Sequence, residues 1–302
     1  MGSSTLVKDF VKKHKWKYII GIFFILCVDT LQLIFPKVVG GITDGLQRGS
    51  ITKGSLLTSV IFIMLIALGV AIFRYLFRVF IMGTEKKMEF HIRKTFFDHL
   101  LTLSAPFYHK HKTGDLMAHA TNDINAVRMA AGMGVLLVTD TIFLLTTTLI
   151  IMLTTIDIKL TLLALIPLPV VAIGGIWFGR VIHKKFTDVQ EAFSGLTDMV
   201  QESFSGIRVI KAFVQERGEL KKFNNASENA FTKNMRLARM WAFFGPLVQV
   251  IATFSLIITI GYGGTQVIYG NISLGDFMAF IIYLGMLIWP VMAFGWVINI
   301  MQ

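Results

Sequence analysis

Six long apolar stretches constrain what this chain can fold into. An α-helix needs about 20 mostly apolar residues to cross the hydrocarbon core of a bilayer, and each stretch reaches that length. The strands of a membrane β-barrel are about half as long and alternate between apolar and polar residues, a pattern that these stretches lack. Hydrophobic residues make up 54% of the chain and the mean hydropathy is +0.67, which is unusually apolar for a soluble domain. The sequence therefore predicts an all-α membrane protein with spans at about 18–39, 55–77, 131–156, 160–180, 241–269 and 277–301.

The distribution of basic residues predicts how the spans are oriented. The formal net charge is +11, and most Lys and Arg residues lie before the first span, between the second and third, and between the fourth and fifth. The other loops carry only Arg48, Lys53 and Lys159. Because Lys and Arg accumulate in cytoplasmic loops, we expect a multi-pass protein of the plasma membrane (the bacterial inner membrane) with both termini in the cytoplasm. This topology accounts for the basic charge, so we expect no nucleic-acid partner.

Two of the expected cytoplasmic connections are much longer than the other loops. Residues 78–128 and 181–239 keep apolar residues three and four positions apart, which predicts that the neighbouring spans continue as helices beyond the membrane. The chain would reverse at 104–122 and at about 213–224, far from the bilayer, which indicates a partner there. Residues 5–14 have an amphipathic pattern and are expected to form an elbow helix in the membrane interface.

The first reversal contains signals for a short helix. Pro106 is expected to end the descending helix, because proline has no N–H group to donate. Thr113 and the glycine after it can begin a short helix that reaches His119. Thr121 or Asn122 would then cap the third membrane helix. The pattern thus predicts a short helix that is separate from the long helices on both sides.

Several stretches resemble one family of membrane proteins. The run "FYHKHKTGDLMAHATNDINAVR" (107–128) resembles the first intracellular loop of ATP-binding-cassette (ABC) exporters, and "QESFSGIRVIKAFVQE" (201–216) resembles the approach to their second. The runs "FPKVVGGITD" and "GNISLGDFMAF" are similar to the outer end of helix 1 and the entry to helix 6. The resemblance covers essentially the whole chain and is closest to bacterial multidrug-type half-transporters. It implies the ABC exporter transmembrane-domain fold, in which six long helices extend into the cytoplasm and form a domain-swapped dimer.

The resemblance also implies a role for the two reversals. In ABC exporters, short coupling helices at these places dock on nucleotide-binding domains. The implied partners are therefore nucleotide-binding domains, a second transmembrane domain in a homodimer or heterodimer, and the lipid bilayer. The first implied coupling helix comprises Lys112, Thr113, Gly114, Asp115, Leu116, Met117, Ala118 and His119. The second comprises Val214, Gln215, Glu216, Arg217, Gly218, Glu219 and Leu220.

The nucleotide-binding domain itself is expected to lie outside this chain. The sequence has no G-x-x-x-x-G-K run followed by Ser or Thr, so it lacks the backbone loop that would hold ATP phosphates. Members of the family continue helix 6 into an ATPase domain, whereas this chain ends at Gln302. We expect residues 1–302 to be a transmembrane domain alone, either shortened or naturally separate, that does not hydrolyse ATP. No cofactor is expected in it; the resemblance places ATP and Mg on the other domain.

Polar and aromatic residues within the spans are candidates for a substrate cavity. Asp29 and Asp140 lie near the middle of spans one and three, where carboxylates are costly and face a cavity or a partner. They are predicted either to recognise cationic substrates or serve a proton step, or else to form a structural pair with a group such as Arg74. Aromatic and methionine side chains can line an adaptable pocket or simply pack. The candidate cavity set is Asp29, Gln32, Asp140, Gln249, Phe280, Tyr283, Met286 and Trp289.

The predicted function is the membrane-spanning part of an ATP-driven exporter of amphiphilic small molecules or lipids. Two alternatives stay open: a proton-coupled secondary transporter that uses Asp29 or Asp140, and a non-transporting membrane scaffold. The long cytoplasmic helices disfavour the first alternative, because ion-coupled transporters rarely need them. The histidines lack a convincing metal-ligand spacing and no activated nucleophile is evident, so neither a metal site nor catalysis within this chain is expected.

Overall fold

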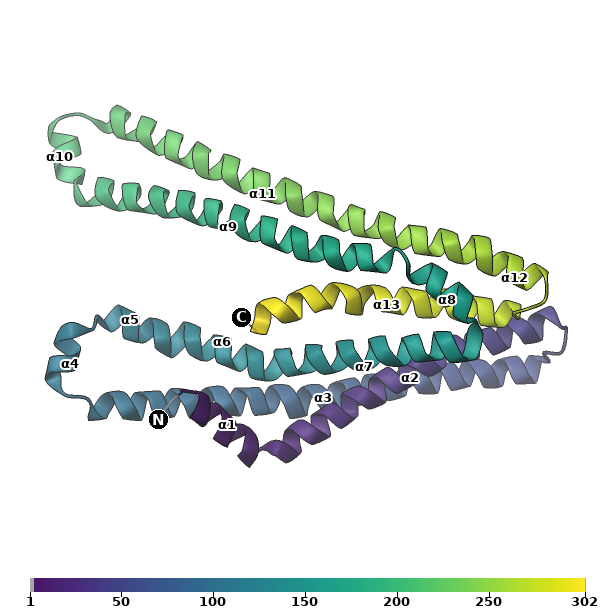
Figure 1. Ribbon diagram of the computed structural model, residues 1–302. Helices are drawn as coiled ribbons and strands as arrows, with labels where there is room; N and C mark the ends of the chain where they lie inside the picture. Colours follow the sequence, from purple (N-terminus) through teal and green to yellow (C-terminus); the bar gives the residue numbers. More distant parts are fainter. Residues whose placement is uncertain (1–2, 302) are drawn as a thin grey trace. The chain divides into compact units, whose positions relative to one another are not determined.

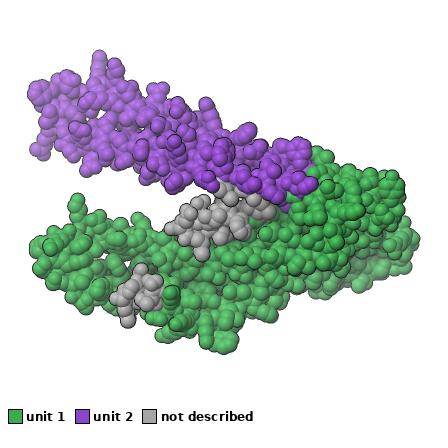
Figure 2. Space-filling model, in the orientation of Figure 1, with its two compact units in different colours: residues 1–165, 255–302 green, residues 166–254 purple. Residues whose placement is uncertain are grey.

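The computed structural model describes residues 3–301, which are almost entirely helical and contain no strand. The chain forms two compact units, which Figure 2 shows in separate colours. Unit 1 consists of residues 1–165 and 255–302, and unit 2 of residues 166–254. Unit 2 is therefore an insertion within the sequence of unit 1.

The helices are long enough and apolar enough to cross a membrane. Five stretches of the described chain meet both conditions, and Leu274–Pro290, the first part of the last described helix, is a shorter apolar segment. The first five predicted spans fall in these five stretches, and the sixth, 277–301, overlaps the shorter segment; the all-α membrane architecture is confirmed. The predicted span 160–180 differs in one respect: it is interrupted before Leu168, because Pro167 cannot donate the backbone bond of a helix interior. The five stretches are Lys15–Gln47, Lys53–Thr102, Thr113–Ile156, Ile158–Ser205 and Glu216–Ile268.

Unit 1 begins with an antiparallel pair of helices. The helix α1 (Ser3–Lys13) leads into α2 (Lys15–Gln47), and a short loop connects α2 to α3 (Lys53–Thr102) (Figure 1). A capping box begins α3: the Ser55 N–H donates to the Thr52 hydroxyl at 3.2 Å, and the Thr52 N–H donates to the Ser55 hydroxyl at 3.1 Å. The segment predicted as an elbow helix is helical as α1, and its position in the membrane interface stays a prediction.

A third long helix of unit 1 runs without a break from Thr113 to Ile156 but changes its winding. Three of its segments have π-helical turns, which are wider than α-helical turns and often occur at functional sites. In order, the segments are α5 (Thr113–Ala118), η1 (His119–Asp123), α6 (Ile124–Met129), η2 (Ala130–Gly134), α7 (Val135–Ile151) and η3 (Met152–Ile156), and α8 (Ile158–Leu165) follows.

The interior of unit 1 is built around α2. This helix packs against α3, α7 and α13 (Leu274–Met301). Ile25 and Val28 of α2 form a buried cluster with Phe77 and Ile81 of α3. Lipid tails are as apolar as these side chains, so close packing rather than the hydrophobic effect holds helices together in a bilayer. The interlocking of these side chains therefore stabilises the pairing of α2 and α3.

Polar contacts join the last helix of unit 1 to the first membrane helix. The Tyr283 hydroxyl donates to the Leu33 carbonyl at 2.7 Å, and the Gly275 N–H donates to Asp44 Oδ1 at 2.6 Å. At the same end, a side chain on Gly40 would place its Cβ 2.6 Å from the Gly275 carbonyl oxygen, so only glycine permits this approach. Ahead of α13, unit 1 also contains η4 (Thr259–Gly263) and α12 (Gly264–Ile268).

Unit 2 is a pair of long helices joined by a short one (Figure 1). They are α9 (Leu168–Ser205), α10 (Ile207–Ala212) and the part of α11 (Glu216–Ile258) up to residue 254. The rings of Phe178 and Phe244 stack with centroids 3.9 Å apart, one of the contacts between the long helices. Most large apolar side chains of this unit are exposed, so it leaves much apolar surface uncovered. They include Trp177, Phe186, Phe193, Phe231 and Phe243.

Candidate functional site

The first tip (residues 103–119) connects α3 to the third long helix of unit 1. It contains two short helices, because α4 (Ala105–Lys110) precedes α5. Pro106 lies in the first turn of α4, where a missing N–H costs no hydrogen bond, so it begins this helix rather than ending α3. The Tyr108 hydroxyl donates to the Leu100 carbonyl at 2.5 Å and ties α4 to the end of α3. The tip is therefore a folded structure and not a loose loop.

The predicted first short helix is present as α5 (Thr113–Ala118). Lys112 and His119 flank it at the two cap positions, and Asp115 lies in its first turn, where a carboxylate is favourable. None of the residues of α5 is buried, and Met117 is 57% exposed. The surface of α5 is thus open to a partner, and its binding to one stays a prediction.

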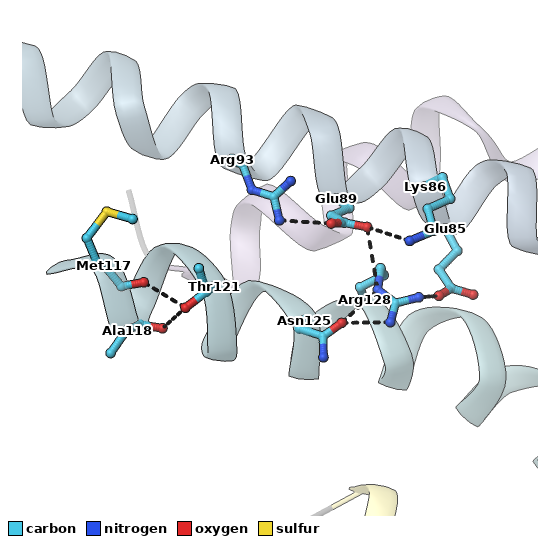
Figure 3. A network of polar contacts seen from close by, with 9 residues as sticks. All are labelled: Glu85, Lys86, Glu89, Arg93, Met117, Ala118, Thr121, Asn125 and Arg128. Atoms are coloured by element: carbon cyan, nitrogen blue, oxygen red, sulfur yellow. Dashed lines mark hydrogen bonds and ion pairs between the residues drawn. The ribbon is translucent and has the colours of Figure 1, made fainter. Parts of the chain in front are cut away.

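The third membrane helix does not begin at the predicted cap residues. The predicted caps at Thr121 and Asn122 are wrong, because α5 continues through η1 into the long helix. The Thr121 hydroxyl donates to the Met117 carbonyl at 2.8 Å, a bond within one helix (Figure 3). His119 Nδ1 lies 2.5 Å from Asp123 Oδ2 on the same stretch. Threonine can bond the carbonyl four residues back as well as cap a helix, and here it does the former.

The second tip (residues 206–220) differs from the sequence prediction. A short helix was expected at 214–220, whereas the structure has it earlier, as α10 (Ile207–Ala212), and most of the predicted stretch is the start of α11. Gly206 ends α9 and leads directly into α10. Val214 turns the chain with a φ of 55°, a conformation that strains a β-branched residue. The chain therefore reverses through these two residues, one on each side of α10.

Polar contacts hold the start of α11 at the second tip. Glu219 accepts from Lys222 at 2.7 Å and from the Ser203 hydroxyl of α9 at 3.2 Å. The Lys222 ammonium, helped by Ser203, holds the pKa of Glu219 below its usual value. Lys211 and Glu216 pair at 3.1 Å across the turn. Beside these polar contacts, the exposed large apolar side chains of this tip are Ile207, Val209, Phe213, Val214 and Leu220.

A polar network joins α3 to α6 in unit 1 (Figure 3). The Arg128 guanidinium of α6 contacts Glu85 of α3, and its Nε lies 3.5 Å from Glu89 Oε2. It also donates to Asn125 Oδ1 from Nε at 3.0 Å and from Nη2 at 2.6 Å. Arg93, on the same helix as Glu89, pairs with it at 2.8 Å. Sequence reasoning missed this network; the available signal was two acids four residues apart on one helix and a polar pair three apart on another.

Two membrane carboxylates come together inside unit 1. Asp29 of α2 is 1% exposed, and its Oδ2 has no hydrogen-bond partner among the described residues. The Asp140 side chain of α7 faces it, and Arg74 of α3 lies within electrostatic reach of both. Two adjacent carboxylates in a medium of low dielectric constant cannot both stay charged unless a cation lies beside them. Without one, one of the two takes up a proton. The arrangement therefore suits a structural group with Arg74 and equally a site for a proton or a cationic ligand.

The other predicted cavity residues differ in their surroundings. Phe280 and Tyr283 are 0% and 2% exposed and pack in the interior of unit 1, so in this structure they are core residues. Trp289 is 56% exposed on unit 1, and Gln249 is an exposed residue of unit 2. Two residues of the set are half-buried in unit 1: Gln32 and Met286. The lining of a substrate cavity by this set stays a prediction.

Comparison with known proteins identifies the family. The ABC transporter transmembrane region matches residues 18–291. The chain is 39% identical over 293 residues to the probable multidrug resistance ABC transporter ATP-binding/permease protein YheI of Bacillus subtilis (strain 168), covering 97% of this chain and 50% of that protein. It is 38% identical over 291 residues to the multidrug resistance-like ATP-binding protein MdlA of Escherichia coli (strain K12), covering 96% and 49%. It is also 29% identical over 190 residues to the ATP-dependent lipid A-core flippase of Desulfotalea psychrophila, covering 63% and 33%.

The residues that these relatives match include the main elements of the fold. The chain spans about half the length of the two multidrug-type relatives, and almost all of it is matched. The matched region includes five long apolar helices and both tips. This chain therefore belongs to the family of ABC transporter transmembrane regions.

Proposed function

We propose that this chain is the membrane-spanning part of an ATP-driven exporter, and that its two tips bind nucleotide-binding domains. The relatives that it half covers are named as ATP-binding proteins, which supports a nucleotide-binding domain beyond the matched half. The observation that carries the proposal is the presence of folded tips with exposed surfaces at the ends of long helix pairs. ATP and Mg²⁺ would bind on that other domain.

The proposed cycle couples the tips to the membrane helices. Nucleotide binding and hydrolysis would displace the tips, and the long helices would pass the displacement on to the spans. The spans would then open to one side of the membrane at a time. Relatives are named for multidrug resistance and for a lipid A-core flippase, so the proposed substrates are amphiphilic small molecules or lipids.

The proposed surroundings follow from charge and exposed surface. Both tips carry basic residues, so by the positive-inside rule they lie in the cytoplasm, with the spans in the bacterial inner membrane.

The exposed apolar side chains of unit 2 would pack on a second transmembrane domain, and a closed two-fold pair is the commonest arrangement. Cysteine pairs placed in unit 2 of one copy and α3 of the other, with Cys27→Ser, should crosslink between chains. A chain that is monomeric in mild detergent at all concentrations would contradict pairing.

A proton-coupled transporter is the second candidate function. The pair formed by the buried Asp29 and the half-buried Asp140 supports it, because such a pair can hold and release a proton. The two candidates differ in their energy source. Export in membrane vesicles that requires ATP, and that persists when the pH gradient is dissipated by an ionophore, supports the exporter. Export that follows the pH gradient without ATP supports the second candidate.

Docking at the first tip is tested in the exporter that contains its ATP-binding domain. The variant Asp115→Ala with Met117→Ala removes two exposed side chains of α5 and should lower export of a lipophilic cation such as ethidium about tenfold or more, as typical coupling energies imply. The control, Asp276→Ala with Met278→Ala, removes the same two residue types at the same spacing from exposed positions of α13 and should export normally. Equal export by both variants would contradict docking through α5.

A further inference from the structure

The network between α3 and α6 contains the most buried ion pair of the described chain. The side chains of Glu85 and Arg128 are 6% and 18% exposed, and they lie 43 positions apart in the sequence. Arg128 also reaches Glu89 of α3. All other ion pairs among the described residues link positions at most five apart. Among the residues that the structure describes, Arg128 is thus the cation that ties two distant segments together by ion pairing.

This network fixes the orientation of α6 against α3 more than it stabilises the fold. A buried ion pair gains little net free energy, because desolvation offsets much of its attraction, and apolar residues of the same size would hold the helices equally well. The planar guanidinium of Arg128 instead fixes an orientation, since it reaches Glu85 through Nη1, Glu89 through Nε and Asn125 through Nε and Nη2 (Figure 3). Gly132 makes room for the pair, because a Cβ at this position would collide with the Glu85 carboxylate.

The network lies between two irregular segments of one helix. Arg128 and Asn125 belong to α6, which has η1 on one side and η2 on the other. Segments with π turns depart from the regular bonding of an α-helix and are places where a helix can bend or rewind. Through η1, α6 is directly continuous with α5 in the first tip. A displacement of α5 can therefore be absorbed in η1 and η2, or it can be passed on to α3 through Arg128.

We propose that Arg128 is a positioning residue for coupling. It holds α6 against α3, so that both long helices follow α5 as one body and η1 and η2 do not absorb the displacement. This inference rests on the proposed docking of α5. Lysine does not replace Arg128 in this role, because a single ammonium cannot hold two carboxylates and an amide in one plane.

The first test compares Arg128→Gln with Arg93→Gln in the exporter that contains its ATP-binding domain. Both variants remove one guanidinium from Glu89, but Arg93 pairs with it within α3 and so joins no second helix. Arg128→Gln should lower the substrate stimulation of ATP hydrolysis, and export, about tenfold or more, while hydrolysis without substrate continues. Arg93→Gln should keep both within about twofold of the unmodified exporter. Equal effects of the two variants would overturn the inference.

A second variant distinguishes the loss of a rigid link between α3 and α6 from a loss of stability. Glu89→Cys with Arg128→Cys, in a Cys27→Ser background, allows a short bifunctional thiol reagent to replace the ionic link with a covalent one. The two side chains are 17% and 18% exposed, so a small reagent can reach them. Before crosslinking, substrate stimulation should be lost as in Arg128→Gln, and crosslinking should restore it. A crosslink that forms without restoring stimulation would overturn the inference.

Hydrogen exchange on this chain in lipid nanodiscs gives a readout that does not depend on ATP. Arg128→Gln should speed exchange across residues 124–134 roughly tenfold and leave α7 unchanged, because α6 and η2 pack against α3 and this contact slows their opening. Unchanged exchange there would overturn the inference and leave docking at α5 intact. Normal export by the variant of Asp115 and Met117 would instead refute the docking, whatever Arg128→Gln does to exchange.

Discussion

Gly132→Ala should destabilise unit 1, although alanine forms helices better than glycine. The helix preference favours alanine by about 1 kcal/mol. Against this, a Cβ at position 132 would collide with the flexible end of the Glu85 side chain, so the carboxylate has to move aside. Displacing Glu85 also leaves Arg128 without one partner of a buried pair, a loss of up to about 3–5 kcal/mol, reduced here because Glu89 and Asn125 remain. The expected net loss is about 2 kcal/mol or more.

The sign of this effect should reverse when the carboxylate is removed. In a Glu85→Ala background, Gly132→Ala meets no carboxylate and should stabilise the chain by about 0.5–1 kcal/mol. Thermal unfolding in detergent measures both changes, with a thiol-reactive dye that reports the exposure of the free, half-buried Cys27. One kcal/mol shifts the midpoint by roughly 2 °C at this chain length. A midpoint that is unchanged or raised by Gly132→Ala in both backgrounds would refute the predicted collision.

Two further predictions concern charged groups. Asp29→Asn should raise the half-saturating concentration for cationic substrates of the proposed exporter and spare neutral ones, because the mid-membrane carboxylate is the proposed attraction. Equal effects on both substrate classes would indicate a structural pair with Arg74. The second prediction concerns pH at the second tip. The pKa of Glu219 lies below its usual value of about 4.3. Its contacts with Lys222 and Ser203 therefore stabilise the start of α11 above that pH. This stabilisation is lost as the pH falls through the lowered pKa. Hydrogen-exchange protection there should fall on acidification, and Glu219→Gln should lack this fall; an identical pH response would refute the assignment.

The sequence predicted the elements that local chemistry controls. The apolar stretches had to become helices, because a chain in lipid must satisfy its own backbone groups. The short helix at Thr113 was predictable from a turn followed by a favourable acid, and α5 is found there. The break at Pro167 between α8 and α9 was not predictable in the same way, because Pro36, Pro246 and Pro290 lie inside unbroken helices.

The parts that could not be predicted depend on distant contacts or on competing local signals. Residues 206 and 218 are both glycine, a residue at which helices commonly end, and only the structure shows that α9 ends at Gly206. Thr121 can cap a helix or bond backwards within one, and only the continuation of η1 decides between them. The contact of Arg128 with Glu85 depends on which faces of two helices meet, and no local pattern encodes that.

The bonds between α2 and α13 also determine how this chain can be made. Asp44 and Leu33 receive their partners from positions 231 and 250 residues later, after the whole of unit 2. At the usual pace of translation, α2 waits on the order of tens of seconds for the helix that completes its surroundings. During that interval its buried Asp29 and its α13-facing side depend on earlier helices or on the insertion machinery for cover. A nascent chain that stops before α13 would keep this side uncovered and present it to the proteases that remove unassembled membrane proteins.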